Sequence, residues 1–189
     1  MTDFMTILDG LFILVSFIWI SEFLLFRNRG VGKGDSLETR SFLLIFTALF
    51  FTIIAALTLQ EFREIVSLVV PMKAAGIILF SIGVFLRFWG ITHLKAQFTR
   101  HVTVREGDEI VSSGPYKRLR HPLYTGLLFI AVGMALYFTS LIAAVIGGLL
   151  TGWMLLKRLR YEEKLLIGKF GTDYEEWMSH RARLLPFIY

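Results

Sequence analysis

The stretch from Ser113 to Gly126 gathers turn formers, cations and polar aromatic residues in an otherwise apolar chain. Pro122 predicts the first position of a helix, where the missing N–H of proline costs nothing. His121, Tyr124 and Thr125 then lie three and four residues apart and share one helix face. An imidazole, a phenol and a hydroxyl would thus meet at a helix N-terminus, whose free N–H groups attract anions.

The same stretch also fits a membrane-surface cap with no chemical role. Gly114-Pro115 predicts a turn, because glycine tolerates a positive φ and proline fixes its own. Basic residues at lipid headgroups and an interfacial tyrosine such as Tyr124 are common where a helix enters a bilayer. The rest of the chain has to decide between a binding site and a cap.

Composition restricts the class of protein. The chain has 189 residues, within the range of one domain. It is 55% hydrophobic, 19% charged and has a mean hydropathy of +0.63, too apolar for an ordinary soluble domain. The absence of cysteine excludes disulfides, thiolate metal sites and a cysteine nucleophile. The net charge of +5 could suggest nucleic acid, but the cations form neither a DNA-binding helix nor an RNA platform. We therefore expect an integral membrane protein that binds no nucleic acid.

Hydropathy predicts a single all-α membrane domain with five transmembrane helices, at residues 4–26, 41–59, 72–92, 123–139 and 141–156. The last two spans are short and almost without a linker, which predicts a tight antiparallel helical hairpin. The fifth helix should continue past the membrane, because no breaker occurs before Gly168 or Gly171. Gly148 and Gly152 predict close helix approach.

Lysine and arginine are concentrated in three segments outside these spans. Residues 27–40, 93–123 and 157–189 hold 17 of the 20 cations. Five crossings place these three segments on one side, which the positive-inside rule makes cytosolic. The sequence therefore predicts an N-terminus away from the cytosol and two cytosolic catalytic segments, residues 93–122 and 157–189.

A few charges fall inside the predicted spans. Asp9 and Glu22 lie in the first span, and Lys73 and Arg87 lie in the third. Arg87 is deepest in its span, and such a side chain must be paired, face a wet cavity or snorkel to the surface.

The predicted topology brings two polar segments together at one membrane surface. Arg158 and Glu162 lie one helical turn apart beyond the fifth span and project from one face. They form a structural ion pair or, beside His121 and Tyr124, one wall of a pocket. Such a pocket at the membrane boundary can take a soluble cofactor from one side and a lipid-like substrate from the other.

At these residues the chain resembles a known family. The run Gly114-Pro115-Tyr116, followed by Arg120-His121-Pro122-Leu123-Tyr124-Thr125-Gly126, resembles the signature of the isoprenylcysteine carboxyl methyltransferases and related phospholipid N-methyltransferases. A second run resembles the C-terminal half of that signature: Glu162-Glu163, Leu166, Phe170-Gly171, Tyr174 and Pro186. The resemblance covers about residues 85–189.

The resemblance implies a membrane enzyme that uses S-adenosyl-L-methionine without a Rossmann fold and has a cytosolic cofactor pocket. It assigns the cofactor site to Thr103, Asp108, Glu109, Ile110, Val111, Tyr116, His121, Pro122, Leu123, Tyr124 and Glu162. Arg158 would face the substrate. The implied reaction is methyl transfer at the membrane surface to a lipid-like or prenylated acceptor, with carboxyl O-methylation as the first choice.

The residue types suit this chemistry. Methyl transfer from a sulfonium requires alignment of the two partners and no covalent enzyme intermediate. Glu162 can bind a ribose hydroxyl or the amino group of the cofactor, and Arg158 can hold an anionic acceptor by a two-pronged contact. An amine or thiol acceptor would have to lose a proton, and His121 is the nearest candidate base.

Several alternatives stay open. The acceptor can be a prenylcysteine carboxylate, a phospholipid amine or a small thiol. A membrane reductase of the sterol type, with NADPH as cofactor, has a similar architecture. A non-enzymatic membrane scaffold is the third reading. The sequence does not indicate the oligomeric state.

Overall fold

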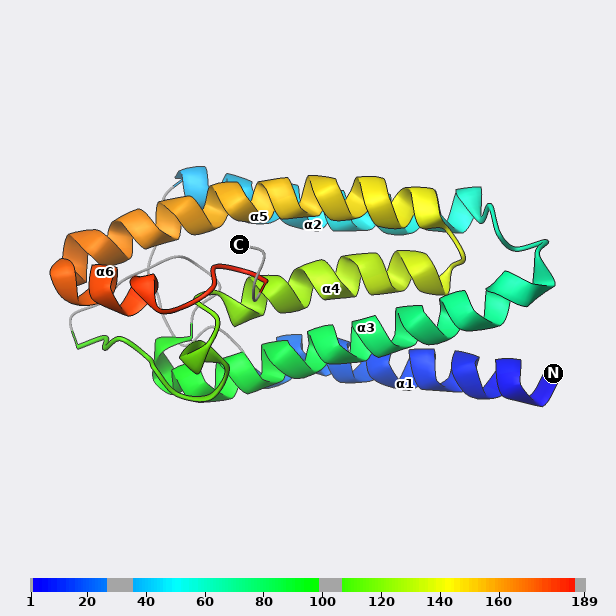
Figure 1. The fold of residues 1–189 in the computed structure, drawn as a ribbon, viewed down its shortest axis with the longest axis horizontal. Helices are drawn as coiled ribbons and strands as arrows, with labels where there is room; N and C mark the ends of the chain where they lie inside the picture. The colour runs from blue at the N-terminus through cyan, green and yellow to red at the C-terminus, as the bar shows by residue number, and fades with distance from the viewer. Residues whose placement is uncertain (1, 27–35, 99–106, 186–189) are drawn as a thin grey trace.

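Long helices run alongside one another in the computed structural model (Figure 1). The structure describes residues 2–26, 36–98 and 107–185. Its elements are α1 (Thr2–Leu25), α2 (Ser36–Leu59), α3 (Val66–Leu94), η1 (Lys95–Gln97), η2 (Gly114–Lys117), α4 (Pro122–Tyr137), α5 (Leu141–Phe170) and α6 (Thr172–Ser179). Within these ranges the chain forms no strand, and only an isolated parallel bridge joins Leu119 with Ala182. The all-α prediction is confirmed for the described residues.

The centre of the bundle is α4. It packs against α2, α3 and α5, and most of its residues are buried. α1 packs against α3 on the other side (Figure 1). The shortest of the long helices is thus the most enclosed one, which explains why its sequence is apolar all round.

Three helices are long and apolar enough to cross a membrane: Met5–Leu25, Ser67–Gln97 and Leu141–Phe170. Two shorter apolar helices, Leu43–Leu59 and Pro122–Tyr137, lie between them in the chain. By their length and composition, these helices support a multi-pass membrane protein. The crossing of the membrane by the two shorter helices stays a prediction.

The helix bounds differ from the predicted spans at two places. α2 already begins at Ser36, within a segment predicted to be a loop, and α3 begins at Val66, before the predicted start at residue 72. α3 therefore contains Pro71, which we expected in the connection. Proline is tolerated near the start of an apolar helix because few backbone bonds are lost there. The predicted extension of the fifth helix is confirmed, since α5 ends at Phe170.

Glycines spaced seven residues apart let α3 and α4 approach backbone to backbone. A Cβ on Gly83 would lie 2.6 Å from the carbonyl oxygen of Gly126, and a Cβ on Gly133 would lie 2.6 Å from the backbone nitrogen of Phe80. The predicted pair on α5 matters less. A Cβ on Gly148 would lie 2.8 Å from a methyl group of Val132, whereas a Cβ on Gly152 would meet only an ordinary contact at 3.9 Å.

Two ion pairs join α1 to α3. Lys73 Nζ lies 2.7 Å from Asp9 Oδ1, and Arg87 binds both carboxylate oxygens of Glu22. The two acidic partners lie 13 residues apart on α1, and the two basic partners lie 14 residues apart on α3. The two ion pairs therefore hold two parallel helices in register at two levels. Arg87 is therefore paired, as the first of its three predicted alternatives required.

We expect Gly83→Ala to destabilise the protein by about 1–3 kcal/mol, because the added methyl group collides with the backbone of α4. Gly168→Ala on α5 is the control, since nothing lies within 4 Å of its Cβ position. The measurement is the melting temperature of both variants in one detergent. Equal melting temperatures would show that the α3–α4 contact is not close-packed.

Candidate active site

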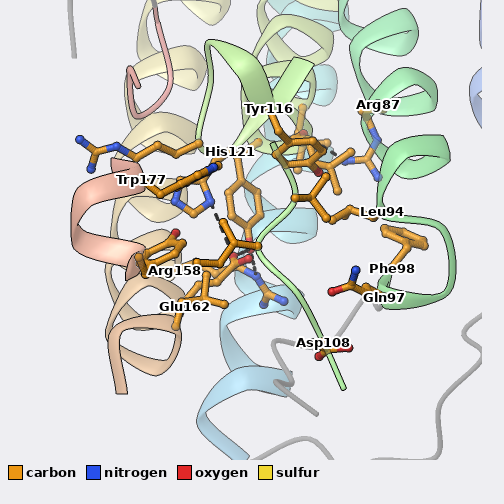
Figure 2. A pocket seen from close by; sticks show the side chains of 18 of the residues that line it. Arg87, Leu94, Gln97, Phe98, Asp108, Tyr116, His121, Arg158, Glu162 and Trp177 are labelled. Carbon is orange, nitrogen blue, oxygen red and sulfur yellow. Dashed lines mark hydrogen bonds and ion pairs between the residues drawn. The ribbon is translucent and has the colours of Figure 1, made fainter. Parts of the chain in front are cut away.

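α6 lies at one end of the bundle (Figure 1), and at this end the chain forms a pocket of about 210 Å³ (Figure 2). Its walls come from nearly every element of the chain, so residues far apart in sequence meet there. The lining residues are Phe23, Ile45, Phe46, Arg87, Leu94, Gln97, Phe98, Asp108, Glu109, Ile110, Val111, Tyr116, Arg120, His121, Leu123, Tyr124, Leu127, Arg158, Glu162, Leu166, Phe170, Tyr174 and Trp177.

The pocket brings together ten of the twelve residues that the sequence assigned to the site. They are Asp108, Glu109, Ile110, Val111, Tyr116, His121, Leu123, Tyr124, Arg158 and Glu162. Pro122 is buried at the start of α4 but does not line the pocket. Thr103 lies outside the described residues. The individual roles of these residues stay predictions.

The turn before α4 shapes one wall. Gly114 has a φ of +57°, and a Cβ there would lie 2.5 Å from the ring of His93, so only glycine fits. The chain then forms η2, which buries Tyr116 against the pocket. His121 occupies the N-cap of α4, and Pro122 follows at the first helical position as predicted.

Thr125 departs from the predicted polar face. Its hydroxyl donates to the carbonyl of Leu184 at 2.7 Å and does not line the pocket. The α-helical spacing was right, but a side chain one position beyond Tyr124 points about 100° away around the helix. Thr125 instead ties the C-terminal segment to α4.

A chain of hydrogen bonds crosses from α4 to α5 at the pocket. Arg158 Nε donates to the hydroxyl of Tyr124 at 3.0 Å, and that hydroxyl donates to Glu162 Oε2 at 2.7 Å. Arg158 is buried and Tyr124 is partly buried, and both line the pocket together with Glu162 (Figure 2). The two residues that sequence spacing suggested as an ion pair thus share the phenol of Tyr124, which fixes both side chains.

His121 lies between two glutamates. Its Nε2 is 3.2 Å from Glu163 Oε1, and its Nδ1 is 3.9 Å from Glu162 Oε2. Glu163 also binds Arg120 and Arg183. Sequence reasoning did not assign a role to Glu163, although its place beside Glu162 in the resembling motif was a visible signal.

The C-terminal segment folds back over the site. The backbone N–H of Arg120 donates to the carbonyl of Ala182, and Ala182 N–H donates to the carbonyl of Arg118. Arg181 donates to the carbonyl of Tyr116 at 2.8 Å. These bonds hold α6 so that Tyr174 and Trp177 line the pocket.

Two of the lining phenols lie outside the membrane-spanning segments and are deeply buried. Burial raises the pKa of Tyr116, and the nearby Glu162 carboxylate raises it further. Burial and the same carboxylate raise the pKa of Tyr174 as well. Both hydroxyls therefore stay protonated at neutral pH and can donate hydrogen bonds to a ligand.

The pocket has an apolar end that sequence reasoning missed. Phe23 of α1, Ile45 and Phe46 of α2, and Leu127 of α4 line it. The rings of Phe23 and Phe46 meet edge to face, with centroids 6.1 Å apart. Hydropathy marks these residues as membrane-facing or buried and carries no signal that distinguishes them from their neighbours.

Sequence reasoning also missed most of the α3 side of the pocket. Leu94, Gln97 and Phe98 line it together with Arg87, for which a wet cavity was one of the expected alternatives. Arg87 donates to the carbonyl of Leu123 at 3.3 Å as well as to Glu22, so one side chain connects α1, α3 and the first turn of α4. Its position inside a predicted span was the signal that could have identified it.

Comparison with known proteins gives one consistent family. Residues 76–168, just under half of the chain, match the model of the isoprenylcysteine carboxyl methyltransferase (ICMT) family. The chain is 30% identical over 115 residues to a probable protein-S-isoprenylcysteine O-methyltransferase of Oryza sativa subsp. indica, covering 60% of each chain.

Other relatives carry the same name. The chain is 29% identical to protein-S-isoprenylcysteine O-methyltransferase B of Arabidopsis thaliana, over 60% of this chain and 58% of the relative. It is 28% identical over 183 residues to the Xenopus laevis protein-S-isoprenylcysteine O-methyltransferase, over 92% of this chain and 62% of the relative. The chain thus spans about 60% of the length of these relatives.

We expect Arg87→Leu to destabilise the protein by about 3–5 kcal/mol, because it leaves the Glu22 carboxylate buried and unpaired. Lys73→Leu is the control. Its partner Asp9 is 47% exposed, against 1% for Glu22, and still accepts a hydrogen bond from the hydroxyl of Tyr137 at 2.7 Å when the lysine is removed.

The measurement is thermal unfolding in one detergent, with the double variant Glu22→Leu/Arg87→Leu included. The double variant should be more stable than Arg87→Leu alone, since no charge is left buried. If Arg87→Leu and Lys73→Leu destabilise equally, the burial of Glu22 does not matter for folding.

Proposed function

We propose that the chain is a membrane methyltransferase that uses S-adenosyl-L-methionine, because residues 76–168 match the model of the isoprenylcysteine carboxyl methyltransferase family. Its acceptor is the carboxylate of a prenylated cysteine at the membrane surface. The observation that carries this proposal is a single pocket in which a polar wall, Arg158–Tyr124–Glu162, faces apolar side chains from α1 and α2.

The polar part of the pocket suits the methyl donor. S-adenosyl-L-methionine carries two positive charges, on its sulfonium and its ammonium, and three carboxylates line this part: Asp108, Glu109 and Glu162. Aromatic side chains beside them, Phe98, Tyr174 and Trp177, offer flat surfaces for an adenine ring. When bound, the cofactor would supply an electrophilic methyl group that a carboxylate oxygen can accept directly.

The apolar end suits a prenyl chain. Phe23, Ile45 and Phe46 come from helices that carry many exposed apolar side chains on their outer faces. α1 packs mainly against α3, and α2 against α4 and α5, so the Phe23–Phe46 edge contact bridges between the two groups of helices. A prenyl chain entering from the bilayer would bury its apolar surface here without crossing water.

The geometry favours a carboxylate acceptor over an amine or a thiol. A carboxylate needs no base, only orientation, and Arg158 can provide a planar two-pronged contact. An amine or thiol would need a base, for which His121 is the first candidate, and would gain nothing from a planar two-pronged contact with Arg158. Positioning alone can account for about 7–11 kcal/mol of barrier reduction in favourable cases.

The same proposal includes five membrane crossings. α1 to α5 would each cross once, with α4 and α5 as a tight hairpin connected by residues 138–140. The pocket would face the cytosol and the N-terminus would face away. The supporting observation is that 17 of the 20 cations fall into three alternate segments.

We expect Arg158→Lys to lower kcat for a prenylcysteine acceptor at least tenfold while the Kd for S-adenosylhomocysteine stays near the wild-type value. Lysine keeps the charge but loses the planar contact, and the lost interaction belongs to the acceptor. Glu162→Gln is the matched comparison, because it should weaken cofactor binding instead. The measurements are acceptor kinetics and titration calorimetry in one detergent.

An Arg158→Lys variant as active as wild type would remove the orienting role of Arg158. An amine or thiol acceptor, with His121 as base, would then be the better explanation. A Glu162→Gln variant with unchanged cofactor affinity and a lower melting temperature would assign Glu162 to structure alone.

A further inference from the structure

Glu162 and Glu163 are adjacent on α5, yet their carboxylates have different surroundings. The side chain of Glu162 is 29% exposed and lines the pocket, whereas that of Glu163 is 6% exposed and does not. Neighbouring residues on a helix point about 100° apart, so the two carboxylates cannot contact the same ligand atoms from the same side. Glu163 lies outside the proposed cofactor contacts, and its burial requires a separate explanation.

Three groups surround the carboxylate of Glu163. Arg183 Nη2 lies 2.9 Å from Oε2, Arg120 Nη1 lies 3.3 Å from Oε1, and His121 Nε2 lies 3.2 Å from Oε1. The two arginines compensate the buried charge, which a single imidazole could not do. The carboxylate can therefore remain ionised and accept a hydrogen bond from the ring of His121.

This contact determines which nitrogen of His121 carries the proton. A carboxylate accepts and does not donate, so the proton of the neutral ring lies on Nε2. The lone pair then lies on Nδ1, at the other side of the ring. Nδ1 faces Glu162, with 3.9 Å to Oε2, and both residues line the pocket (Figure 2).

Two acceptors 3.9 Å apart can both lie within hydrogen-bond distance of one donor nitrogen. A primary ammonium has three N–H donors and no acceptor, so it matches this pair in charge and in donor number. Glu162 Oε2 is fixed by the hydroxyl of Tyr124 at 2.7 Å, and His121 is fixed by Glu163. Both acceptors are thus oriented before a ligand binds.

We propose that Glu163 is a positioning residue that fixes His121, so that His121 Nδ1 and Glu162 Oε2 together receive the α-ammonium of the cofactor. The identity of the ligand rests on the proposed function, whereas the orientation of His121 does not. Two experiments separate these two parts.

The first experiment reads the tautomer of His121 in the wild-type protein. Nitrogen NMR of ¹⁵N-histidine-labelled protein in detergent distinguishes a protonated from an unprotonated ring nitrogen, and His121→Gln assigns the signal. At mildly alkaline pH, we expect Nε2 to be protonated and Nδ1 unprotonated, because Nε2 faces the carboxylate of Glu163. A protonated Nδ1 contradicts the proposal without the need for any further variant.

The second experiment measures recognition of the amino group by titration calorimetry. S-adenosylhomocysteine is compared with the analogue in which hydrogen replaces its amino group. Wild type should bind the amino-bearing ligand at least tenfold more tightly, as expected for a charge-assisted hydrogen bond. In Glu163→Leu, whose side chain cannot accept a hydrogen bond from His121, this ratio should fall towards one.

Arg183→Gln is the matched control. It removes a contact between Glu163 and the C-terminal segment but leaves Arg120 to compensate the carboxylate and leaves the contact with His121, so it should keep the tenfold ratio. If Arg183→Gln loses the ratio as fully as Glu163→Leu, Glu163 acts only by holding the C-terminal segment, and the proposal is wrong.

Two further outcomes remain distinguishable. If Glu163→Leu does not fold, His121→Gln removes Nδ1 directly, and an unchanged ratio in that variant contradicts the proposal. If wild type binds neither ligand, the proposed function fails, while the NMR spectrum still decides the orientation of His121.

Discussion

Charged side chains next to hydrocarbon have to be paired, and this requirement determines how the helices of the chain are arranged. Glu22 is paired with Arg87, which also binds the carbonyl of Leu123 at the start of α4. If this pair is removed, α1 loses its buried ion pair with α3. The first turn of α4 loses the hydrogen bond that Arg87 donates to the carbonyl of Leu123. Tyr124 lies in the same turn and lines the pocket. The Glu22–Arg87 pair is therefore connected to the polar wall of the pocket through the first turn of α4.

Charged side chains are also paired at the polar wall of the pocket. The hydroxyl of Tyr124 lies between Arg158 and Glu162, and Glu163 is surrounded by two arginines and His121. These contacts fix the side chains before any ligand arrives. For a reaction in which alignment is the main requirement, such preorganisation is the part of catalysis that the protein can supply. The close glycine contact between α3 and α4 holds the pocket residues of α3 next to those of α4.

The helices and the polar residues of the site were accessible from the sequence, because both depend on local signals. Apolar runs predicted the long helices, and the Pro122 signal predicted the start of α4. The polar pocket residues shared one surface in the predicted topology, so their proximity followed from counting spans.

Other features depend on which helix faces which, and no local signal carries that information. In the sequence, Phe23 and Phe46 cannot be distinguished from other phenylalanines of the apolar helices. Only the packing of α1 and α2 shows that they line the pocket. Thr125 was assigned to the wrong face because the partner that binds it, Leu184, lies 59 residues away. The similarity to the family, over residues 76–168, supports the reaction class proposed for these residues.

The most direct test of the central claim is transfer of a labelled methyl group from S-adenosyl-L-methionine to an N-acetylated S-prenylcysteine by the purified protein in detergent. The acceptor is compared with its carboxamide, which keeps the prenyl chain but has no carboxylate. The account predicts label in a base-labile methyl ester from the carboxylate acceptor and none from the carboxamide. Equal labelling of both acceptors, or label in neither, would contradict it.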